Sequence, residues 1–141
     1  MIYVFDLDGT LTIPSERMKR YCNIPPDQWV RPSTEDILAE KPNYSIVDIF
    51  ACIRESFEVS IVTGRPEAVR DDTETWLADN WIYPDALFMR KDGDFRSDEE
   101  VKPELIAHLG KKVVIFEDRT CMVKRWRRLG YTCLQVGDGD Y

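Results

Sequence analysis

An apolar run that ends in two aspartates constrains the fold of this chain more than any other stretch. Ile2–Phe5 predicts a buried strand, and Asp6-Leu7-Asp8-Gly9-Thr10 follows it directly. Carboxylates two residues apart point the same way only while the backbone stays extended, and Gly9 then allows a turn that a side chain would obstruct. Two acids at the carboxyl end of a buried strand indicate an open α/β sheet, which binds its ligands at that edge.

The composition is that of an ordinary soluble globular protein. The 141 residues are 43% hydrophobic and 32% charged, which predicts a single domain over residues 1–141. The net charge of −7 argues against binding along a nucleic-acid duplex. A local basic rim would still suffice to hold the end of a strand.

The cysteines and the apolar runs indicate where in the cell the protein is expected. The four cysteines form no CxxC pair and no cluster with His108, so we expect reduced thiols and a cytoplasmic location. Asp6 and Asp8 interrupt the only apolar run near the N-terminus, and no run approaches transmembrane length. We therefore expect neither a signal peptide nor a membrane partner.

Strands and helices alternate along most of the chain. We expect further strands at 59–62, 86–89, 113–116 and 131–136. We expect helices at 45–56, from Pro66 to about residue 80, from Pro103 to about residue 109, and at 120–129. Lys102 then lies at the N-terminal edge of the third of these helices. The alternation predicts a parallel, doubly wound (Rossmann-like) sheet of about five strands.

Residues 12–42 interrupt this alternation. Five prolines punctuate them, so only short helices near 15–21 and 33–40 are expected, the second capped by Ser33 or Thr34. An irregular segment directly after a catalytic turn indicates a flap over the site. Tyr21 and Trp29 either stack on a substrate base or, as burial preferences favour, pack the flap onto the core.

Three further polar signals occur where strands end or a helix begins. Thr63 follows the second strand, Lys102 precedes a helix, and Glu117-Asp118 follows the fourth strand. Each alone is common in turns and helix caps, but the carboxyl ends of parallel strands meet at one edge of a sheet. We therefore expect all of them to join Asp6 and Asp8 in one site.

This set of side chains suits phosphoryl transfer. Asp6 is the predicted nucleophile, which forms an aspartyl-phosphate, and Asp8 is the acid/base for the leaving oxygen and the hydrolytic water. Thr63 donates to a phosphoryl oxygen, and Lys102 neutralises charge on the transferred group. The turn residues assigned to substrate binding are Gly9, Thr10 and Gly64.

A divalent cation completes the predicted chemistry, because it allows an enzyme carboxylate and a phosphate to approach each other. Mg²⁺ is a hard cation that takes oxygen ligands and keeps several waters. The predicted ligands are Asp6, Asp118, the backbone carbonyl of Asp8 and, through water, Glu117.

These residues resemble the four motifs of the haloacid dehalogenase (HAD) superfamily of phosphatases. The motifs are Asp6-Leu7-Asp8-Gly9-Thr10, Thr63, Lys102 and Glu117-Asp118, and their order and spacing match over nearly the whole chain. The resemblance implies a HAD core, and the short spans between motifs leave room for only a minimal cap, the flap at about 12–42. It also implies the roles given above.

The C-terminal part is similar to the end of the phosphatase domain of bacteriophage polynucleotide kinase/3′-phosphatases. The similarity lies in Glu117-Asp118-Arg119-Thr120, Trp126-Arg127-Arg128-Leu129-Gly130, Cys133, Gln135-Val136 and Gly139-Asp140-Tyr141. It implies that Arg17 and Arg65 contact the substrate phosphate or its neighbours, and that Asp98 orients one of the basic groups. Glu117 departs from the pattern, because that relative has aspartate there.

Three functional hypotheses follow. The leading one is a Mg²⁺-dependent phosphatase that removes a 3′-phosphate from a DNA or RNA end, as in nucleic-acid repair. A phosphatase for nucleotides or other small phosphoesters is the first alternative, and the acidic net charge favours it. The second is a catalytically quiet partner module of a kinase or ligase system. The chain has no Walker sequence, so a kinase or ligase would be a separate partner.

Overall fold

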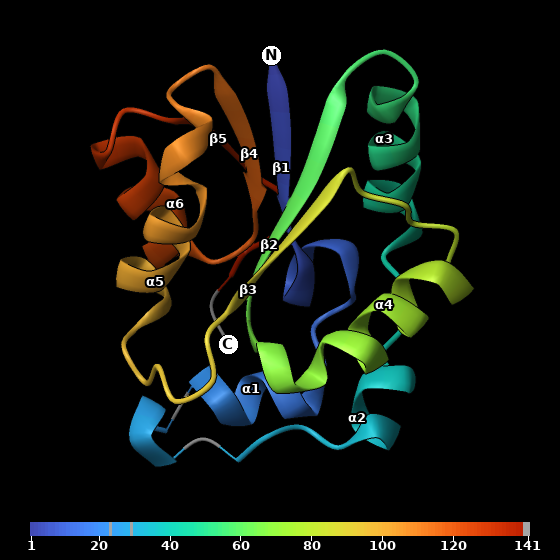
Figure 1. The fold of residues 1–141 in the computed structure, drawn as a ribbon, viewed down its shortest axis with the longest axis vertical. Coiled ribbons are helices and arrows are strands. Elements are labelled where there is room, and N and C mark those ends of the chain that lie inside the picture. Colours follow the sequence, from blue (N-terminus) through green and yellow to red (C-terminus); the bar gives the residue numbers. More distant parts are fainter. Residues whose placement is uncertain (23, 29, 140–141) are drawn as a thin grey trace.

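The computed structural model describes residues 1–22, 24–28 and 30–139 (Figure 1). Trp29 lies outside the described residues, and so does the side chain of Tyr21. Both interpretations of these two aromatic residues therefore stay predictions. Within the described ranges, no helix combines the length and the apolar character that crossing a lipid bilayer requires.

Five parallel strands form a single sheet in the order β3-β2-β1-β4-β5. The strands are β1 (Ile2–Asp6), β2 (Glu58–Pro66), β3 (Ala86–Arg90), β4 (Val113–Glu117) and β5 (Thr132–Gln135). The chain leaves central β1 toward β2 on one side and later returns to β4 on the other. This reversal creates a crevice at the carboxyl ends of β1 and β4, where Asp6 and Glu117 are the last strand residues. The predicted doubly wound sheet is confirmed.

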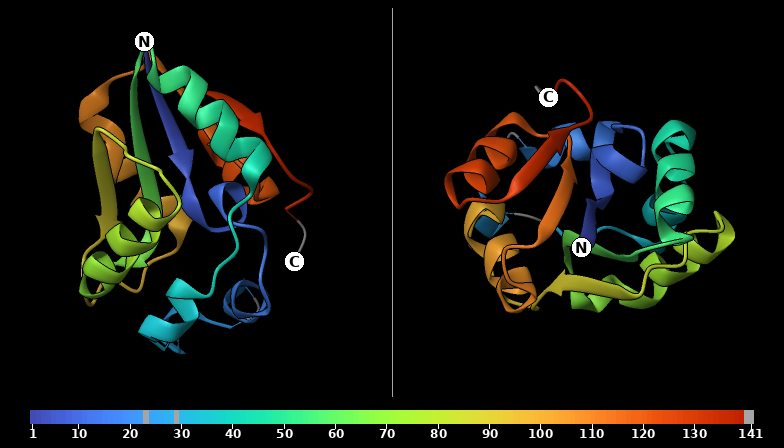
Figure 2. Two further views of the ribbon diagram at one scale, coloured as in Figure 1. Left: turned by 90° about the vertical axis from the view of Figure 1, so that its right-hand side faces the viewer. Right: turned by 90° about the horizontal axis from the view of Figure 1, so that it is seen from above.

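Helices cover both faces of the sheet (Figure 2). The face-covering helices are α3 (Tyr44–Arg54), α4 (Arg70–Asp79), α5 (Asp98–Ile106) and α6 (Thr120–Arg128). The flap adds α1 (Glu16–Cys22) and α2 (Thr34–Leu38), which lie beyond the carboxyl ends of the strands (Figure 1). Side chains of α3 and α4 pack on one face and those of α5 and α6 on the other. Short helical turns lie at Leu7–Leu11, Pro26–Gln28, Glu67–Val69 and Ala107–Leu109.

The period of two in the strands divides the core between these faces. In β1, Phe5 belongs to the core under α3 and α4, whereas Val4 belongs to the core under α5 and α6. Phe5 stacks on Phe116 of β4 with ring centroids 4.3 Å apart. Trp76 of α4 and Trp126 of α6 are fully buried, one in each core. Together these side chains fix the two central strands that carry the site.

Only some of the apolar side chains of the helix predicted at 45–56 are buried. Ile46 and Phe50 are buried, but Ile49 is 41% exposed and Phe57 is 46% exposed. α3 ends at Arg54, two residues before the predicted end, so Phe57 follows the helix and packs its ring on Tyr3.

The helix predicted to open at Pro66 begins later. β2 continues through Pro66, with a register shift between Thr63 and Pro66, and α4 starts at Arg70. Pro66 has an extended ψ of 153°, so it precedes the helical turn at Glu67–Val69 and does not open it. The shifted strand end carries Arg65 into the sheet edge, where its side chain is buried.

The helix predicted to open at Pro103 begins five residues earlier. Ser97 and Glu100 form a capping box at the start of α5, so Lys102 lies inside the helix. A proline inside a helix leaves the carbonyl four residues back without its donor. Here that carbonyl belongs to Glu99, and it accepts a 3.0 Å hydrogen bond from Arg125 Nε. This bond from α6 offsets the interruption.

The two ends of the flap, residues 12–42, are tied together. Thr12 and Pro42 form an isolated antiparallel bridge. The amide of Ile13 donates to the Lys41 carbonyl, and the amide of Asn43 donates to the Leu11 carbonyl, each at 2.8 Å. Ser33 caps α2, as predicted. The flap therefore leaves and rejoins the domain through one narrow neck beside the Asp6–Thr10 turn.

The central strands set the stability of the fold. Ile115 of β4 is fully buried, so Ile115→Ala should lower the free energy of unfolding by about 2–5 kcal/mol. Leu134 of neighbouring β5 is 46% exposed, so Leu134→Ala should cost well under half as much. Urea unfolding followed by tryptophan fluorescence measures both variants. Equal losses would contradict the assignment of the core.

Candidate active site

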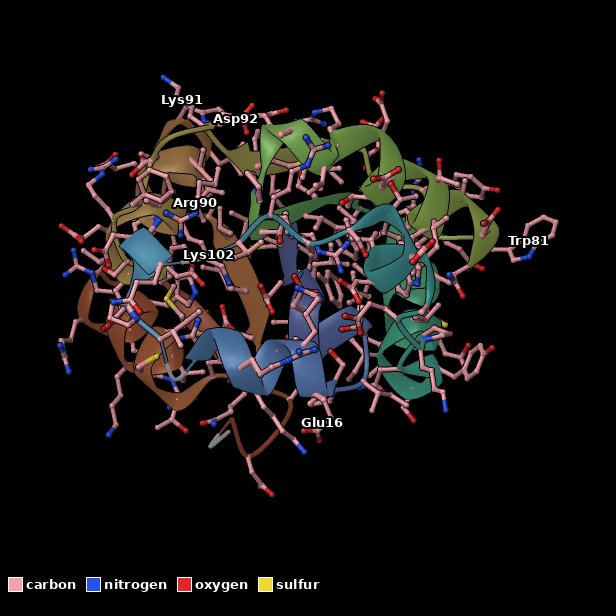
Figure 3. The ribbon with its side chains drawn as sticks, turned by 90° about the horizontal axis from the view of Figure 1, so that it is seen from below. Glu16, Trp81, Arg90, Lys91, Asp92 and Lys102 are labelled. Carbon is pink, nitrogen blue, oxygen red and sulfur yellow. The ribbon has the colours of Figure 1, made fainter. Side chains whose placement is uncertain are left out.

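A buried lysine joins the central strand to its neighbour. Nζ of Lys102, on α5, lies 2.6 Å from Asp6 Oδ1 and 3.3 Å from Glu117 Oε2. All three residues are at most 2% exposed. Figure 3 shows Lys102 and Arg90 toward the middle of the molecule, seen from the side of the flap, whereas Lys91 and Trp81 extend at its margin.

Asp118 completes an acidic cluster beside this lysine. Carboxylate oxygens of Asp6, Glu117 and Asp118 all lie within 4.8 Å of one another, and the three residues are buried. Thr10 Oγ1 donates to Asp118 Oδ1 at 3.2 Å. The hydroxyl of Thr10, assigned from sequence to the substrate, therefore positions an acid.

A close approach of the chain's last described residue also shapes this corner. Gly139 has a φ of +64°, and a Cβ there would lie 2.2 Å from the Asp118 carbonyl oxygen. A side chain is excluded because the backbone of Gly139 packs directly behind Asp118 and Arg119. The similarity noted at Gly139-Asp140-Tyr141 thus begins at a residue that supports the acidic cluster.

Burial of like charges raises the pKa values of Asp6 and Asp118. Burial, followed by the charge of Glu117, raises the pKa of Asp118 to about 7. The same two causes raise the pKa of Asp6 well above its usual value, with Lys102 opposing them. Burial alone would lower the pKa of Lys102, but the carboxylates of Asp6 and Glu117 outweigh it and raise this pKa. The cluster therefore favours an additional positive charge or proton.

The residues fit a divalent cation. Three carboxylates and one ammonium leave a net charge of −2 when all are ionised, and Asp6 Oδ2 is buried without a hydrogen-bond partner among the described residues. Carboxylate oxygens are the donors that Mg²⁺ prefers. Asp6, Glu117 and Asp118 would hold the ion, and the predicted contribution of the Asp8 carbonyl stays a prediction.

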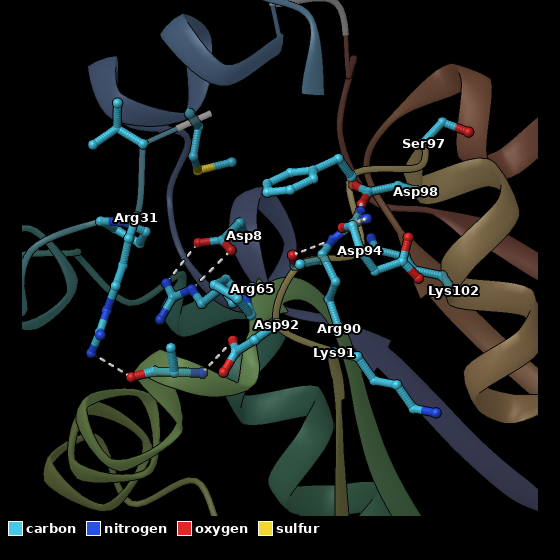
Figure 4. Close-up of a pocket in the computed structure, with 18 of the residues that line it drawn as sticks. Asp8, Arg31, Arg65, Arg90, Lys91, Asp92, Asp94, Ser97, Asp98 and Lys102 are labelled. Carbon is cyan, nitrogen blue, oxygen red and sulfur yellow. Dashed lines mark hydrogen bonds and ion pairs between the residues drawn. The ribbon is translucent and has the colours of Figure 1, made fainter. Parts of the chain in front are cut away.

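The second aspartate of the motif has different partners. The carboxylate of Asp8 lies 2.6 Å from Arg65 Nη2, and Arg65 Nε adds a 2.9 Å hydrogen bond (Figure 4). Arg17 Nη2 lies 2.7 Å from the same carboxylate. Burial raises the pKa of Asp8, but the charges of Arg65 and Arg17 outweigh it and hold this pKa well below its usual value. The two arginines predicted to reach the substrate thus converge on the predicted acid/base.

Glu40, at the end of the flap, is a site residue that the sequence reasoning missed. Its Oε1 lies 2.7 Å from Arg17 Nη2, and it accepts hydrogen bonds from Arg17 Nε at 2.8 Å and Ser15 Oγ at 3.0 Å. The Glu40 side chain is 2% exposed. Nothing in the local sequence distinguishes it from other acidic residues, because its role depends on the neck that brings it beside Arg17.

A third charged group surrounds Asp98. Its carboxylate lies 2.5 Å from Arg90 Nη2 and 2.9 Å from Arg119 Nη1. It also fills the space beside Gly64, where an added Cβ would meet Asp98 Oδ1 at 2.4 Å. Glycine is needed at position 64 for this approach. Asp98 therefore pairs with two basic groups, and the sequence reasoning gave neither Arg90 nor Arg119 a role at the site.

Thr63 and Gly9 are the remaining residues that the sequence predicts for the site. Thr63 is buried, and its Oγ1 accepts a 3.2 Å hydrogen bond from the Arg65 amide, so its own proton is available to another acceptor. Gly9 has a φ of 89°, which favours glycine, and its amide donates to Thr12 Oγ1 at 3.0 Å. The substrate contacts assigned to these residues stay predictions.

The charged groups open into one pocket of about 570 Å³. Asp6, Asp8 and Lys102 line it, together with residues of the flap and of the loop after β3. Its basic side chains are Arg17, Arg31, Arg65, Arg90, Lys91, Lys102 and Arg119, and its acidic ones are Asp6, Asp8, Asp92, Asp94 and Asp98. Two carboxylates and several arginines therefore share a cleft that suits a phosphoryl group, and Asp6 joins this cleft to the acidic cluster.

Comparisons with known proteins agree with this arrangement. The family model described as "Polynucleotide kinase PNKP phosphatase domain" matches residues 1–141. A chain from the "Structure of Pnkp1/Rnl/Hen1 complex" is 28% identical with a TM-score of 0.80, over 99% of this chain and 47% of that one. A chain from the "Structure of the Pnkp1/Rnl/Hen1 RNA repair complex" is 27% identical with a TM-score of 0.80, over 99% and 43%. This chain thus spans less than half the length of either.

More distant structures share the fold. A putative beta-phosphoglucomutase from Thermotoga maritima is 17% identical, with a TM-score of 0.58 over 92% of this chain and 82% of that one. A HAD-family enzyme from Bacteroides thetaiotaomicron, an Asp-to-Ala mutant in complex with magnesium and inorganic phosphate, is 13% identical, with a TM-score of 0.57 over 99% and 95%. The HAD-like core predicted from the sequence is confirmed.

Mg²⁺ should stabilise the protein more at pH 8 than at pH 5.5. Because burial raises the pKa of Asp118 from 3.8 to about 7, the metal-free fold holds a proton there that the unfolded chain releases. The stability of the metal-free fold should therefore fall as the pH rises from about 4 to 7. Below pH 7 the proton competes with the ion, so the apparent Mg²⁺ affinity should be roughly 30-fold weaker at pH 5.5 than at pH 8.

Thermal unfolding with and without Mg²⁺ at both pH values measures this effect. Asp118→Asn should remove most of the Mg²⁺-dependent shift at pH 8, whereas Asp79→Asn, on the exposed side of α4, should retain it. Shifts of equal size at the two pH values would contradict the assigned role of Asp118.

Proposed function

Because this chain belongs to the family of polynucleotide kinase (PNKP) phosphatase domains, we propose that it is a Mg²⁺-dependent phosphatase that removes a 3′-phosphate from DNA or RNA ends. The observation that carries the proposal is the opposed environments of Asp6 and Asp8 in one pocket. Asp6 lies beside a lysine within a cation-binding cluster, whereas two arginines hold Asp8. Carboxylates with such different surroundings suit two different catalytic roles.

The first step of the proposed reaction is attack by the Asp6 carboxylate on phosphorus. A bond forms between Asp6 and phosphorus, the ester bond to O3′ breaks, and Asp8 gives a proton to the leaving oxygen. In the second step Asp8 takes a proton from water, which attacks phosphorus and releases inorganic phosphate from Asp6. The bound cation would supply charge neutralisation at Asp6 and the phosphoryl oxygens.

Arg17 and Arg65 would couple substrate arrival to the protonation of Asp8. Both hold the Asp8 carboxylate in its ionised form, which is the wrong form for a general acid. A phosphate dianion offers each guanidinium a competing acceptor. As the arginines turn toward the phosphate, their hold on Asp8 weakens and its pKa rises, so Asp8 becomes able to donate a proton.

Lys102 and Thr63 would act on the transferred group. Lys102 contacts Asp6 Oδ1 at 2.6 Å, so it orients the nucleophile and offsets charge next to it. The Thr63 hydroxyl would donate to a phosphoryl oxygen. Thr10 and Gly64 would bring backbone amides toward the phosphate, and Gly9 would shape the turn that presents them. Asp98 would keep Arg90 and Arg119 in place.

A separate repair partner is part of the proposal. The two similar chains at 27–28% identity were solved in complexes with Rnl and Hen1. By analogy we propose that this chain acts beside a separate kinase or ligase, in the cytoplasm. The free thiols of Cys52, Cys121 and Cys133 suit a reducing compartment. A nucleotide phosphatase is the alternative, since the chain's net charge of −7 favours small substrates.

Phosphate release from matched substrates tests the proposal. Oligonucleotides with a 3′-phosphate should be hydrolysed with Mg²⁺ faster than their 5′-phosphorylated counterparts and faster than 3′- or 5′-mononucleotides. Asp6→Asn should lower kcat by at least ~10³-fold, because the nucleophile is lost. Fast turnover of 5′-mononucleotides alone would favour the nucleotide phosphatase. No turnover of any substrate, unchanged by Asp6→Asn, would favour the quiet partner module.

Glu40 should act through Arg17. We expect Arg17→Ala to lower kcat/KM for a 3′-phosphorylated oligonucleotide by ~10–10³-fold, the scale for a charged hydrogen bond in the transition state. Glu40→Gln keeps the shape but removes the charge that holds Arg17, and should cost ~10-fold. The exposed flap variant Glu35→Gln should have no such effect.

The double variant separates positioning from general damage. If Glu40 acts only through Arg17, adding Glu40→Gln to Arg17→Ala should change kcat/KM by less than about 2-fold. Additive losses in the double variant would remove Glu40 from the site.

A further inference from the structure

The outer part of the pocket carries an exposed aromatic ring. Phe95 lies in the loop between β3 and α5, lines the same pocket as Asp6 and Asp8, and is 56% exposed. An exposed aromatic side chain in a ligand cleft is a ready surface for a flat, partly apolar group. The reaction described above does not use it.

The backbone on both sides of this ring is fixed by a buried arginine. Arg90 is 3% exposed, and its Nη1 donates to the carbonyl of Asp94 at 2.9 Å and to that of Arg96 at 2.6 Å. The residue before Phe95 and the residue after it are therefore both tied to one guanidinium. Arg96 adds bonds to Asp94 and, at 2.8 Å, to Glu104 of α5. The backbone that carries the exposed ring is therefore tied by hydrogen bonds on both sides.

The same arginine joins this loop to the reaction centre. Nε of Arg90 donates to the Gly64 carbonyl at 2.9 Å, and its Nη2 pairs with Asp98. Gly64 follows Thr63 directly. The position of the Phe95 loop is therefore set by the turn assigned to the phosphate, and a group bound to both would lie at a defined distance from the nucleophile.

Charge and size indicate what the pocket takes. Its described lining has seven basic and five acidic side chains, a net charge of +2 on a chain whose net charge is −7. With a divalent cation offsetting the two further acids of the cluster, Glu117 and Asp118, the excess of basic side chains in the lining attracts an anion, whereas much of the remaining surface repels it. The volume of about 570 Å³ lies in the range of small-ligand sites, which suits one nucleotide.

We propose that Phe95 forms a subsite for the unpaired terminal base of the 3′-phosphorylated strand. This proposal rests on the function proposed above. The base stacks on the ring while its 3′-phosphate reaches Asp6. Ile24 and Val30 of the flap line the same pocket and supply apolar contacts for the nucleoside. Stacking tolerates any base, because every base has a π-face. The subsite therefore detects the presence of a base but not its identity.

The test uses two oligonucleotides that both end in a 3′-phosphate. One carries thymine on its last nucleotide, and the other has a baseless tetrahydrofuran residue there. The wild-type kcat/KM should be roughly 5- to 100-fold higher for the strand with the base, the range that base–aromatic stacking supplies. Phe95→Ala should bring this ratio close to 1, and Phe95→Trp should retain it. Tyr83 is an exposed aromatic residue that precedes β3, whereas Phe95 follows this strand. Tyr83→Ala should therefore leave the ratio unchanged.

Each outcome decides between the two proposals. If both strands are hydrolysed and Phe95→Ala leaves the ratio at its wild-type value, the subsite is overturned while the 3′-phosphatase stands. If neither strand releases phosphate but p-nitrophenyl phosphate does, the proposed 3′-phosphatase is overturned and the subsite with it. Because Phe95 is exposed, thermal unfolding of the variants should match the wild type, and this measurement separates a lost contact from a lost fold.

Discussion

The pairing of Lys102 with Asp6 and Glu117 is the interaction on which the site depends. It joins the ends of the two strands that flank the crevice to a helix on one face of the sheet. One buried ammonium among three buried carboxylates leaves an excess of negative charge. Such an arrangement is costly in a low-dielectric interior unless a cation completes it. The fold thus retains an excess of negative charge at the point where the proposed phosphate chemistry would use a metal ion.

Charge is divided among neighbouring groups that share this edge of the sheet. In the cluster of Asp6, Glu117 and Asp118, the negative charge exceeds the positive charge of Lys102. At Asp8, by contrast, the charges of Arg17 and Arg65 balance those of Asp8 and Glu40. Around Asp98, two arginines give an excess of positive charge. In the proposed reaction a phosphate ester would therefore meet distinct partners on its different sides, which would fix its orientation before any bond breaks.

Much of this arrangement was predictable from the sequence because it follows from strand ends. Asp6, Thr63 and Glu117 each lie in or directly after a buried apolar run, and parallel strands end at one edge. The helix starts were less predictable. At Pro66 and Pro103 the usual preference of proline for a first helical turn gave way to a longer strand and to an earlier capping box.

Partners that depend on long-range packing could not be read from the sequence. Glu40 reaches Arg17 only because the flap closes on itself, and Arg90 is an ordinary strand-end arginine until the loop after it folds back. The direction of a side chain within a turn is equally hidden. The sequence shows that Thr10 carries a hydroxyl, but only the structure shows that this hydroxyl donates to Asp118.

The narrow neck at Thr12 and Pro42 has a consequence for how such domains diversify. Since the neck is closed by backbone hydrogen bonds, the two ends of the insert stay side by side whatever the length of the chain between them. Doubling the length of a closed loop costs only about 0.6 kcal/mol of chain entropy. A lineage could therefore lengthen the part of the insert between Arg17 and Glu40, and with it change the range of molecules admitted, while the two residues that reach the Asp8 group stay in place.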